Sequence, residues 1–324
     1  MKGAMVHSRR NLESTVLAVI LALAACSSTD GQATGTTATV LAATVAPTTV
    51  VVNTTTSTIP GVFADPVALA HELSVVEAGI RRLGASAAVL DELGRRQQLA
   101  YRALARHPEW EADLLTLVDP VASGPLTYHL AARKASVEHA AGKPPVDSPA
   151  VLPAWTIVEP LPVSELRGYY DRAAAATGVR WQYLAAIHFQ ETRMGRVVGV
   201  SSAGAVGPMQ FLPKVWAACC AGDPLSARDA IMGAAKFLGQ HGAPADMRKA
   251  LNAYNPNSGY VGAVTAYAQN MIADEAAYLG YHGWQVFYGT SAGTVRLPAG
   301  YESATEIDAI EYVRHHPDDL LPAT

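Results

Sequence analysis

The sequence has few charged side chains and no excess of positive charge, and both shortages limit what the protein can bind. Charged residues make up 16% of the 324 residues, and the formal net charge is −4. Such a chain has no broad basic surface to hold phosphates, so we do not expect nucleic acid among its partners. Half of the residues are hydrophobic, which is enough for one large core or two small ones.

Cysteine is also scarce, with only Cys26 and the adjacent pair Cys219 and Cys220. A structural zinc site needs four ligands, and nothing like a second cysteine pair or an HxxxH motif accompanies this pair. We therefore expect no metal and no cofactor. Neighbouring cysteines bond to each other only with backbone strain. The pair is predicted to be two small buried thiols, with a vicinal disulfide as the alternative.

The N-terminus lacks a run long enough to cross a bilayer but has the parts of an export signal. Basic residues precede an apolar run from Val16 to Ala25, which ends in small residues before Cys26. The "LAAC" of Leu23 to Cys26 resembles a bacterial lipobox, in which the cysteine is lipidated. This predicts an extracytoplasmic protein anchored to the cell membrane by lipid at Cys26. Ordinary secretion with an incidental cysteine is the alternative.

Composition and periodicity divide the chain into parts. After the cysteine come mostly Thr, Ala, Val, Ser, Gly and Pro with a single charge, Asp30, so this stretch has little to bury. The predicted parts are a signal peptide (1–25), a disordered tether (26–61), an α-helical segment (62–150), a compact helical domain (151–281) and an extended C-terminal tail (282–324).

The α-helical segment is predicted as a helical hairpin or small bundle. Its apolar residues recur at helical spacing, first at Leu69, Leu73, Val76 and Ile80 and then, on either side of Gly84, at Leu83, Leu90 and Leu93. "VDPVASGPLTYH" (118–129) is predicted to be a turn because of its prolines and glycine. Near the other end of the chain, "GWQVFYGT" and "GTVRLP" predict two short strands, and the last twenty residues are predicted to fray.

One acidic residue lies in a position that favours chemistry. A helix from about Trp181 places Leu184, Ile187, His188 and Glu191 on one face. A glutamate that continues a buried stripe is partly desolvated, which favours its protonated form and makes it a usable acid near neutral pH. The alternative is an exposed glutamate at a helix end, paired with a nearby arginine, Arg193 or Arg196. His188 is predicted to be a hydrogen-bonded core histidine rather than a proton shuttle.

The loop after this helix has the composition of a polar cleft wall. Gly204 and Gly207 tolerate positive φ, and Ser201 and its neighbour supply hydroxyl and N–H groups. Gln210 has both a donor and an acceptor, which suits sugar hydroxyls or an acetamido group. Pro213 is then predicted to begin the next helix.

Two tyrosines are candidates for the other side of the cleft. Tyr254 is predicted to end a helix begun near Asp246, and the turn "YNPNSGY" brings Tyr254 and Tyr260 to one edge, where aromatic rings can stack on sugars. Both can instead pack in the core, since Tyr260, Val264, Tyr267 and Met271 also form a helical stripe.

Together the motifs "ETRMG", "SSAGAVGPMQF", "DAIMGAAKFLGQHGA" and "ALNAYNPNSGYVGAV" resemble the catalytic domain of bacterial lytic murein transglycosylases of the soluble type or membrane-bound type B. The resemblance covers about residues 163–279. It implies a mainly α, lysozyme-like catalytic domain, preceded here by an α-helical segment and followed by a short β-like tail. It also implies that peptidoglycan glycan strands are the partner.

The resemblance assigns roles to single residues. It makes Glu191 the sole catalytic acid and base, Ser201 the residue that orients the sugar acetamido group or the glutamate, and Gln210 the glutamine of the MQ motif. It places Tyr254 near the glutamate, with Asn255 beside it. The sequence departs from the usual pattern at Thr192 and Pro208, where the family commonly has serine and an aliphatic residue.

Most glycan-cleaving enzymes use two carboxylates, yet no second acid lies between Glu191 and Gln210. The implied reaction needs only one, because the substrate's own C6 hydroxyl is the nucleophile and a 1,6-anhydro sugar is the product. The alternatives are a lysozyme-like muramidase, with Asp223 or Asp229 as second acid, and an inactive glycan-binding envelope lipoprotein.

Overall fold

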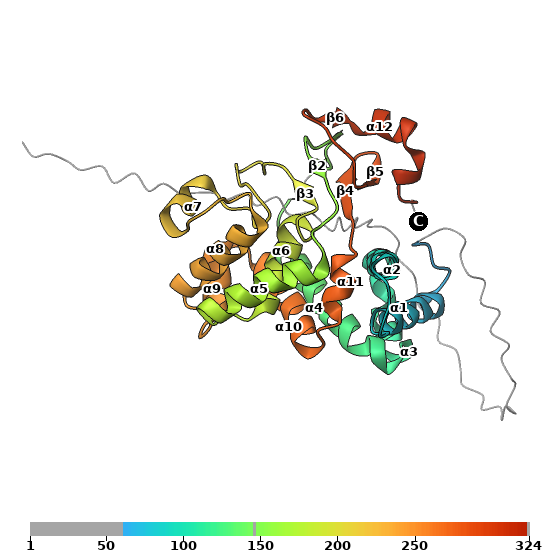
Figure 1. The fold of residues 1–324 in the computed structure, drawn as a ribbon. Helices are drawn as coiled ribbons and strands as arrows, with labels where there is room; N and C mark the ends of the chain where they lie inside the picture. The colour runs from blue at the N-terminus through green and yellow to red at the C-terminus, as the bar shows by residue number, and fades with distance from the viewer. Residues whose placement is uncertain (1–60, 145–146, 323–324) are drawn as a thin grey trace, which may run out of the picture.

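The computed structural model describes residues 61–144 and 147–322. The predicted signal peptide, the lipidation site Cys26 and all of the tether but Gly61 lie outside these residues. The protein is mainly α, as the sequence predicts. Figure 1 shows the helices forming the bulk of the molecule and the short strands gathered at one end with the C-terminal helix. Within the described ranges no helix is both long and apolar enough to cross a bilayer.

The N-terminal part is a group of helices: α1 (Pro66–Ile80), α2 (Ala87–Arg106), the 3₁₀ turn η1 (Pro108–Trp110), α3 (Glu111–Leu117) and α4 (Pro120–Ala140). Helix α1 begins where Asp65 accepts a hydrogen bond from the Ala68 N–H at 2.8 Å, with Pro66 in the first turn. The predicted stripe of α1 is fully buried. Leu83 instead lies in the turn before α2 and is 98% exposed, so it does not continue the stripe.

The prediction of a turn over residues 118–129 is wrong, because all of them from Pro120 onward belong to helix α4. Pro120 occupies the first turn, where its missing N–H costs nothing. Pro125 lies inside the helix and is buried together with Leu126. Packing of α4 against α1 and α10 therefore outweighs the local effect of the proline.

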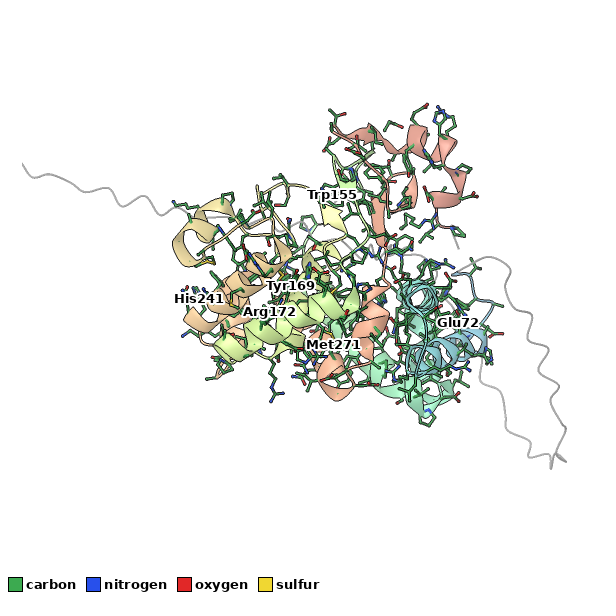
Figure 2. All side chains as sticks on the ribbon, viewed as in Figure 1. Glu72, Trp155, Tyr169, Arg172, His241 and Met271 are labelled. Atoms are coloured by element: carbon green, nitrogen blue, oxygen red, sulfur yellow. A yellow bond between two sulfur atoms is a disulfide. The ribbon has the colours of Figure 1, made fainter. Side chains whose placement is uncertain are left out.

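The central part holds most of the remaining helices: α5 (Val163–Thr177), α6 (Trp181–Thr192), α7 (Pro213–Cys219), α8 (Ala227–Gln240), α9 (Met247–Tyr254), α10 (Ser258–Ala273) and α11 (Ala277–His282). Helix α10 packs against both α4 and α6. As a result one hydrophobic core runs from Leu69 in α1 to Trp284 and joins the N-terminal helices to the helical domain. Figure 2 shows side chains filling the space between these helices, with Met271 of α10 among them.

The strands form three two-stranded antiparallel sheets: β1 (Val151–Leu152) with β6 (Ile307–Asp308), β2 (Thr156–Ile157) with β3 (Val197–Val198), and β4 (Val286–Thr290) with β5 (Gly293–Leu297). The predicted strands at 286–297 are confirmed as a hairpin that pairs Val286 with Leu297. Around them a smaller core includes Leu152, Trp155 and Val295.

The prediction that the last twenty residues fray and form only an extended tail is wrong. Residues 305–322 contain strand β6, helix α12 (Ala309–His315) and the turn η2 (Pro317–Asp319). Asp319 is buried and accepts hydrogen bonds from Arg296 and Tyr312, at 2.7 and 2.9 Å. These contacts fix the C-terminal part on the β4–β5 hairpin, an arrangement that local composition does not reveal.

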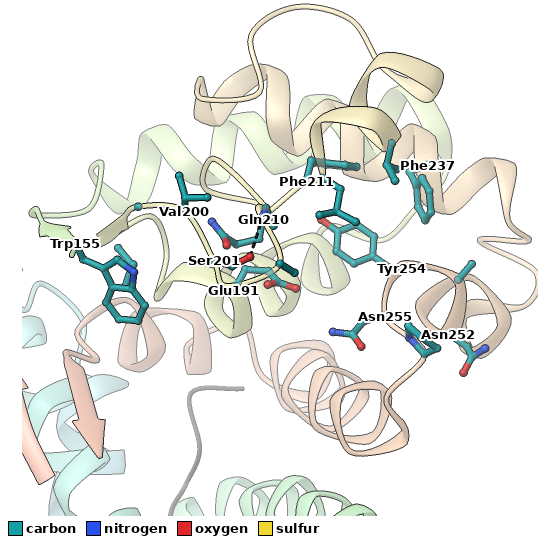
Figure 3. Close-up of a pocket in the computed structure, with 18 residues that line it drawn as sticks. Trp155, Glu191, Val200, Ser201, Gln210, Phe211, Phe237, Asn252, Tyr254 and Asn255 are labelled. Carbon is teal, nitrogen blue, oxygen red and sulfur yellow. Dashed lines mark hydrogen bonds between the residues drawn. The ribbon is translucent and has the colours of Figure 1, made fainter. Parts of the chain in front are cut away.

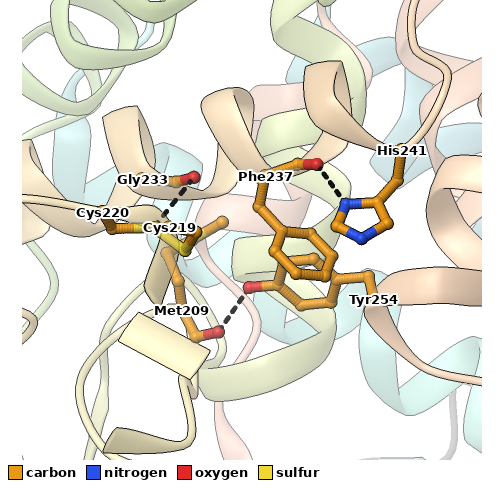
Figure 4. The surroundings of a disulfide bond; sticks show 7 residues. All are labelled: Met209, Cys219, Cys220, Gly233, Phe237, His241 and Tyr254. Atoms are coloured by element: carbon orange, nitrogen blue, oxygen red, sulfur yellow. Dashed lines mark hydrogen bonds between the residues drawn. A yellow bond between two sulfur atoms is a disulfide. The ribbon is translucent and has the colours of Figure 1, made fainter. Parts of the chain in front are cut away.

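The prediction of two buried thiols is also wrong, because Cys219 and Cys220 form a disulfide with each other and are only half-buried. Cys219 is the last residue of α7, whereas Cys220 is extended. In a continuing helix adjacent side chains point in different directions, and this change of backbone conformation lets the sulfur atoms meet. Figure 4 shows the disulfide beside Gly233 of α8, whose carbonyl oxygen lies 3.6 Å from Cys220 Sγ.

Candidate active site

Helix α6 carries the candidate acid at its C-terminal end. Leu184, Ile187 and His188 are fully buried, so the predicted stripe is confirmed and Glu191 continues it. The helix ends abruptly because Arg193 and Met194 both adopt left-handed backbone conformations, with φ of 54° and 61°. Glu191 is thereby held in the last turn of a rigid helix rather than on a loop.

The residue after the acid holds two loops together. Thr192 Oγ1 donates to the carbonyl oxygen of Pro208 at 2.7 Å and accepts from the Gly195 N–H at 3.1 Å. The two positions at which the sequence departs from the family pattern are thus in direct contact. The interaction needs only a hydroxyl at position 192 and a backbone carbonyl at position 208. Threonine keeps the hydroxyl of serine, and proline keeps the carbonyl of any other residue, so both changes preserve the interaction.

His188 behaves as the predicted core histidine. Its ring is fully buried, and Nδ1 lies 2.7 Å from the hydroxyl of Tyr170. Burial lowers the pKa of His188 to about 3, so the ring is neutral at physiological pH. It therefore supports α6 from behind and is not a charged acid for the cleft.

A cavity of about 360 Å³ lies over the end of α6. Figure 3 shows it with Glu191, Ser201 and Gln210 near its centre, Trp155 and Val200 at one side, and Tyr254, Asn255 and Asn252 at the other. Of the residues that line it, Glu191 is the only one with a carboxylate. The volume is in the range of ligand sites, and its walls are mostly apolar with a few polar groups, as such sites usually are.

The environment of Glu191 favours its protonated form. Burial raises the pKa of Glu191 to about 7, while a hydrogen bond from Tyr260 acts in the opposite direction. The Tyr260 hydroxyl donates to Glu191 Oε1 at 2.7 Å. A carboxyl group with a pKa near 7 can both give and take a proton at neutral pH.

The alternative of an exposed glutamate paired with arginine is wrong. The Arg193 guanidinium donates to the carbonyl oxygen of Phe189, at 2.6 Å, and lies over the Phe189 ring. Arg196 pairs with Glu159 at 2.7 Å. Neither guanidinium forms a salt bridge with Glu191. Neither arginine therefore offsets the cost of burying the ionised carboxylate.

The loop from Gly199 to Gln210 forms one wall of the cavity. Ser201 Oγ accepts a hydrogen bond from the Ala205 N–H at 3.0 Å, which closes a tight turn and leaves the hydroxyl proton available to a ligand. Gly204 and Gly207 have positive φ, as predicted, and a Cβ on Gly207 would collide with the carbonyl of Pro224. Gln210 lines the cavity, and its amide nitrogen donates to the Gly207 carbonyl at 2.9 Å.

Tyr254 and Tyr260 make different contacts from those that the sequence predicts. Tyr254 ends helix α9, as predicted, and lines the cavity, but its hydroxyl donates to the Met209 carbonyl at 2.6 Å. Tyr260, in α10, makes the contact with Glu191 and is 7% exposed. It thus belongs both to the buried helical stripe and to the site. The prediction that Tyr260 lies at the cleft edge beside Tyr254 is wrong, because Tyr260 does not line the cavity.

Asn255 joins the cavity wall with Tyr254. It is 5% exposed, and its side-chain oxygen accepts from the Asn257 N–H at 3.1 Å. This contact leaves the amide N–H₂ for a ligand or a neighbouring acceptor. Ser201, Gln210, Tyr254 and Asn255 are all brought to the cavity that contains Glu191.

The acids considered for a two-carboxylate mechanism lie elsewhere. Asp229 accepts from the Asp223 N–H at 3.1 Å and pairs with Arg228, while Asp223 accepts from the Leu225 N–H at 2.9 Å. Neither lines the cavity. Their carboxylates cap the loop before α8 and are not placed to activate a water molecule beside Glu191.

Sequence reasoning missed Trp155, which lines the cavity from outside the motif-bearing region. Its ring packs edge-on against Tyr288 with ring centroids 5.5 Å apart and lies close to Gly199, where a Cβ would collide with it. The isolated tryptophan between prolines in "LPAWTIVEP" could have indicated a functional residue. Its place in the cavity, however, depends on the pairing of β2 with β3, which the local sequence does not show. It also missed Phe211 and Phe237, the aromatic rings that lie around Tyr254.

Comparison with protein-family models, with curated protein sequences and with solved structures finds no match.

Proposed function

We propose that the protein is a peptidoglycan lytic transglycosylase that cleaves the β-1,4 bond between N-acetylmuramic acid and N-acetylglucosamine without water. The observation that carries this proposal is a single carboxyl group in a cavity of ligand size, with its pKa raised to about 7. The resemblance of the motifs around Glu191, Ser201, Gln210 and Tyr254 agrees with it.

In the first step, protonated Glu191 gives its proton to the glycosidic oxygen. The bond to the anomeric carbon breaks, N-acetylglucosamine leaves as an alcohol, and the acetamido group of N-acetylmuramic acid supports the positive centre. The Tyr260 hydroxyl, already hydrogen-bonded to Oε1, stabilises the carboxylate that forms. Burial alone would make that carboxylate less stable.

In the second step, the Glu191 carboxylate takes the proton of the C6 hydroxyl as its oxygen bonds to the anomeric carbon. A 1,6-anhydro ring closes, and the acid returns to its starting form. No atom of water enters the products, so one carboxyl group serves both steps. An intramolecular nucleophile also has a high effective concentration.

The cavity walls suit an amino sugar. Ser201, Gln210 and Asn255 place hydroxyl and amide groups around Glu191, and these match hydroxyl and acetamido groups on a glycan. Trp155 and Tyr254 supply aromatic surface on opposite sides. Aromatic rings and a few fixed polar groups are a combination that ligand sites commonly use.

Mass spectrometry of products from purified sacculi tests the proposal. Digestion by the wild-type protein in H₂¹⁸O should give 1,6-anhydro muramic ends that carry no ¹⁸O. Reducing ends that carry ¹⁸O would identify a hydrolytic muramidase instead. Binding to sacculi without any new chain ends would identify a glycan-binding protein that lacks catalysis.

With the lipid anchor predicted at Cys26, this activity would be placed outside the cytoplasmic membrane, next to the cell wall. Growth with a labelled fatty acid, followed by comparison of the wild type with a Cys26→Ser variant, tests the anchor. Label on the wild type alone would support the lipid anchor at Cys26, and label on neither protein would contradict it.

A further inference from the structure

A second, smaller cavity of about 30 Å³ lies where α2, α4 and α10 meet. Tyr101, Arg102, His129, Arg133 and Tyr267 are among its lining residues, and it shares no lining residue with the cavity around Glu191. We refer to it as the arginine cavity. Its volume is sufficient for one or two waters or for a single small polar group, but not for a sugar ring.

Two buried nitrogen atoms on residues of the arginine cavity have no hydrogen-bond partner within the described part of the chain. They are Arg102 Nε and His129 Nε2. His129 is 6% exposed and stacks on Tyr101, with ring centroids 3.6 Å apart. Burial lowers the pKa of His129 to about 3, so its ring is neutral and carries one N–H. Arg102 Nε always carries a hydrogen, and a buried donor without an acceptor destabilises a fold, which indicates that an acceptor belongs here.

Three arginines in or near the cavity bind only neutral acceptors. Arg102 donates to Thr294 Oγ1 at 3.2 Å, Arg106 to the Gly61 carbonyl at 2.8 Å, and Arg193 to the Phe189 carbonyl at 2.6 Å. All of these acceptors are neutral. Within residues 61–144 and 147–322, none of these arginines has a carboxylate as a salt-bridge partner.

The arginines are close enough to affect one another. Burial, followed by the charges of Arg106 and Arg193, lowers the pKa of Arg102 to about 10. The charge of Arg193 also acts on Tyr267, a second residue of the cavity. Arg133 differs from the other arginines because it pairs with Glu111. The cavity therefore combines neighbouring positive charges with a buried Arg102 donor that has no partner, and of its two lining arginines only Arg133 has a carboxylate as a salt-bridge partner within the described residues.

We propose that the arginine cavity binds an oxyanion, a carboxylate or phosphate group presented by a larger ligand. The group would accept from Arg102 Nε and from His129 Nε2–H, and exposed Arg106 would draw it in from solvent. A guanidinium fork suits both types of oxyanion. The small volume admits only the acidic end of the ligand. The proposal does not depend on the activity proposed for Glu191.

Thermal unfolding of the full-length protein at pH 7 tests the site with inorganic phosphate and with acetate, each against chloride at equal ionic strength. A ligand that binds only the folded state raises the unfolding temperature, by about 3 °C if the added anion is at tenfold its dissociation constant. The stronger of the two responses distinguishes a phosphate ligand from a carboxylate ligand.

Arg102→Met is the decisive variant, because methionine keeps much of the stem and removes the buried charge. In chloride this variant should unfold at a higher temperature than the wild type. The rise in unfolding temperature that phosphate or acetate causes, the anion increment, should disappear. Arg106→Met, at the exposed rim, should reduce the increment. Arg95→Met, on the same helix but paired with Glu92, should keep it.

If neither anion raises the unfolding temperature of the wild type, the proposal is overturned and the cavity holds only water. An equal increment in Arg102→Met and the wild type would place the anion elsewhere, with the same consequence.

Discussion

Two glutamates of this protein lie in helices, Glu77 fully buried and Glu191 half-buried, and their surroundings differ in almost every respect. Glu77 of α1 is fully buried and receives hydrogen bonds from Arg81 at 2.6 Å, from Gln97 at 2.8 Å and from Tyr101 at 3.0 Å. Glu191 of α6 receives one, from the neutral hydroxyl of Tyr260. The first carboxylate is compensated by charge and by several donors, whereas the second has one neutral donor and, within the described residues, no salt bridge.

The comparison separates a carboxylate that holds the fold together from one that is available for chemistry. Around Glu77 every partner is fixed by further contacts: Arg81 also binds Asp274, and Gln97 also accepts from Trp284. Around Glu191 the remaining neighbours line a cavity. An acid is useful for proton transfer when its environment leaves the two protonation states close in free energy at working pH.

The largest effect should come from removing the acid of the cleft. Glu191→Gln keeps the shape and can still accept from Tyr260, but it has no proton to transfer. Cleavage of sacculi should fall by about 1,000-fold, within the usual range for a general acid and base. Release of soluble muropeptides measures it, and unchanged release would remove Glu191 from the mechanism.

The reciprocal change at Glu77 should affect stability instead. Glu77→Ala leaves Gln97, Tyr101 and part of Arg81 without their acceptor, so the free energy of unfolding should fall by about 3–5 kcal/mol. Urea denaturation measures this, and the cleavage rate of the remaining folded protein should be unchanged. Glu92→Gln, which breaks the exposed pair with Arg95, is the control and should cost less than about 1 kcal/mol. Equal losses in both variants would mean that Glu77 is not structural.

The dependence of stability on pH should distinguish the acid from its glutamine variant. Since burial raises the pKa of Glu191 to about 7 from 4.5, the folded state holds a proton that the unfolded state releases between these values. Wild-type stability is therefore lost as the pH rises through this window, by up to about 3 kcal/mol. Glu191→Gln should escape this loss, so its advantage over the wild type should grow from pH 4 to pH 8. A constant difference across that range would contradict the raised pKa.

The smallest of these effects should come from the tyrosines. Tyr260→Phe removes the hydrogen bond that lowers the pKa of Glu191, so the alkaline limb of the activity profile should move to higher pH. Turnover should fall by about tenfold, because the carboxylate formed in the first step loses a charge-assisted bond. Tyr254→Phe is the matched control, since its hydroxyl binds the Met209 carbonyl. If the limb moves in Tyr254→Phe and not in Tyr260→Phe, the assignment of the tyrosines is reversed.

The parts of the site that depend on local sequence were predictable. Helical spacing indicated the buried stripe that ends at Glu191, and the glycines indicated the positive φ of the loop. Proline at the start of α7 and the alternation in β4 and β5 follow from equally local rules.

The parts that depend on contacts between distant segments were not. Tyr254 and Tyr260 are six positions apart, and only the packing of α10 against α6 decides which one reaches the acid. Trp155 enters the cleft through the pairing of β2 with β3, and helix α4 continues through Pro125 because α10 covers it. In each case tertiary packing outweighs or extends the local preference.

The most direct test is a ¹³C NMR titration of the glutamate side-chain carboxyl carbons in the wild-type protein, with Glu191→Gln used to assign the signal. The account predicts that the Glu191 carbon titrates with a midpoint near 7, and that the midpoint rises in Tyr260→Phe. A midpoint near 4.5 would show an ordinary exposed carboxylate and would contradict the account.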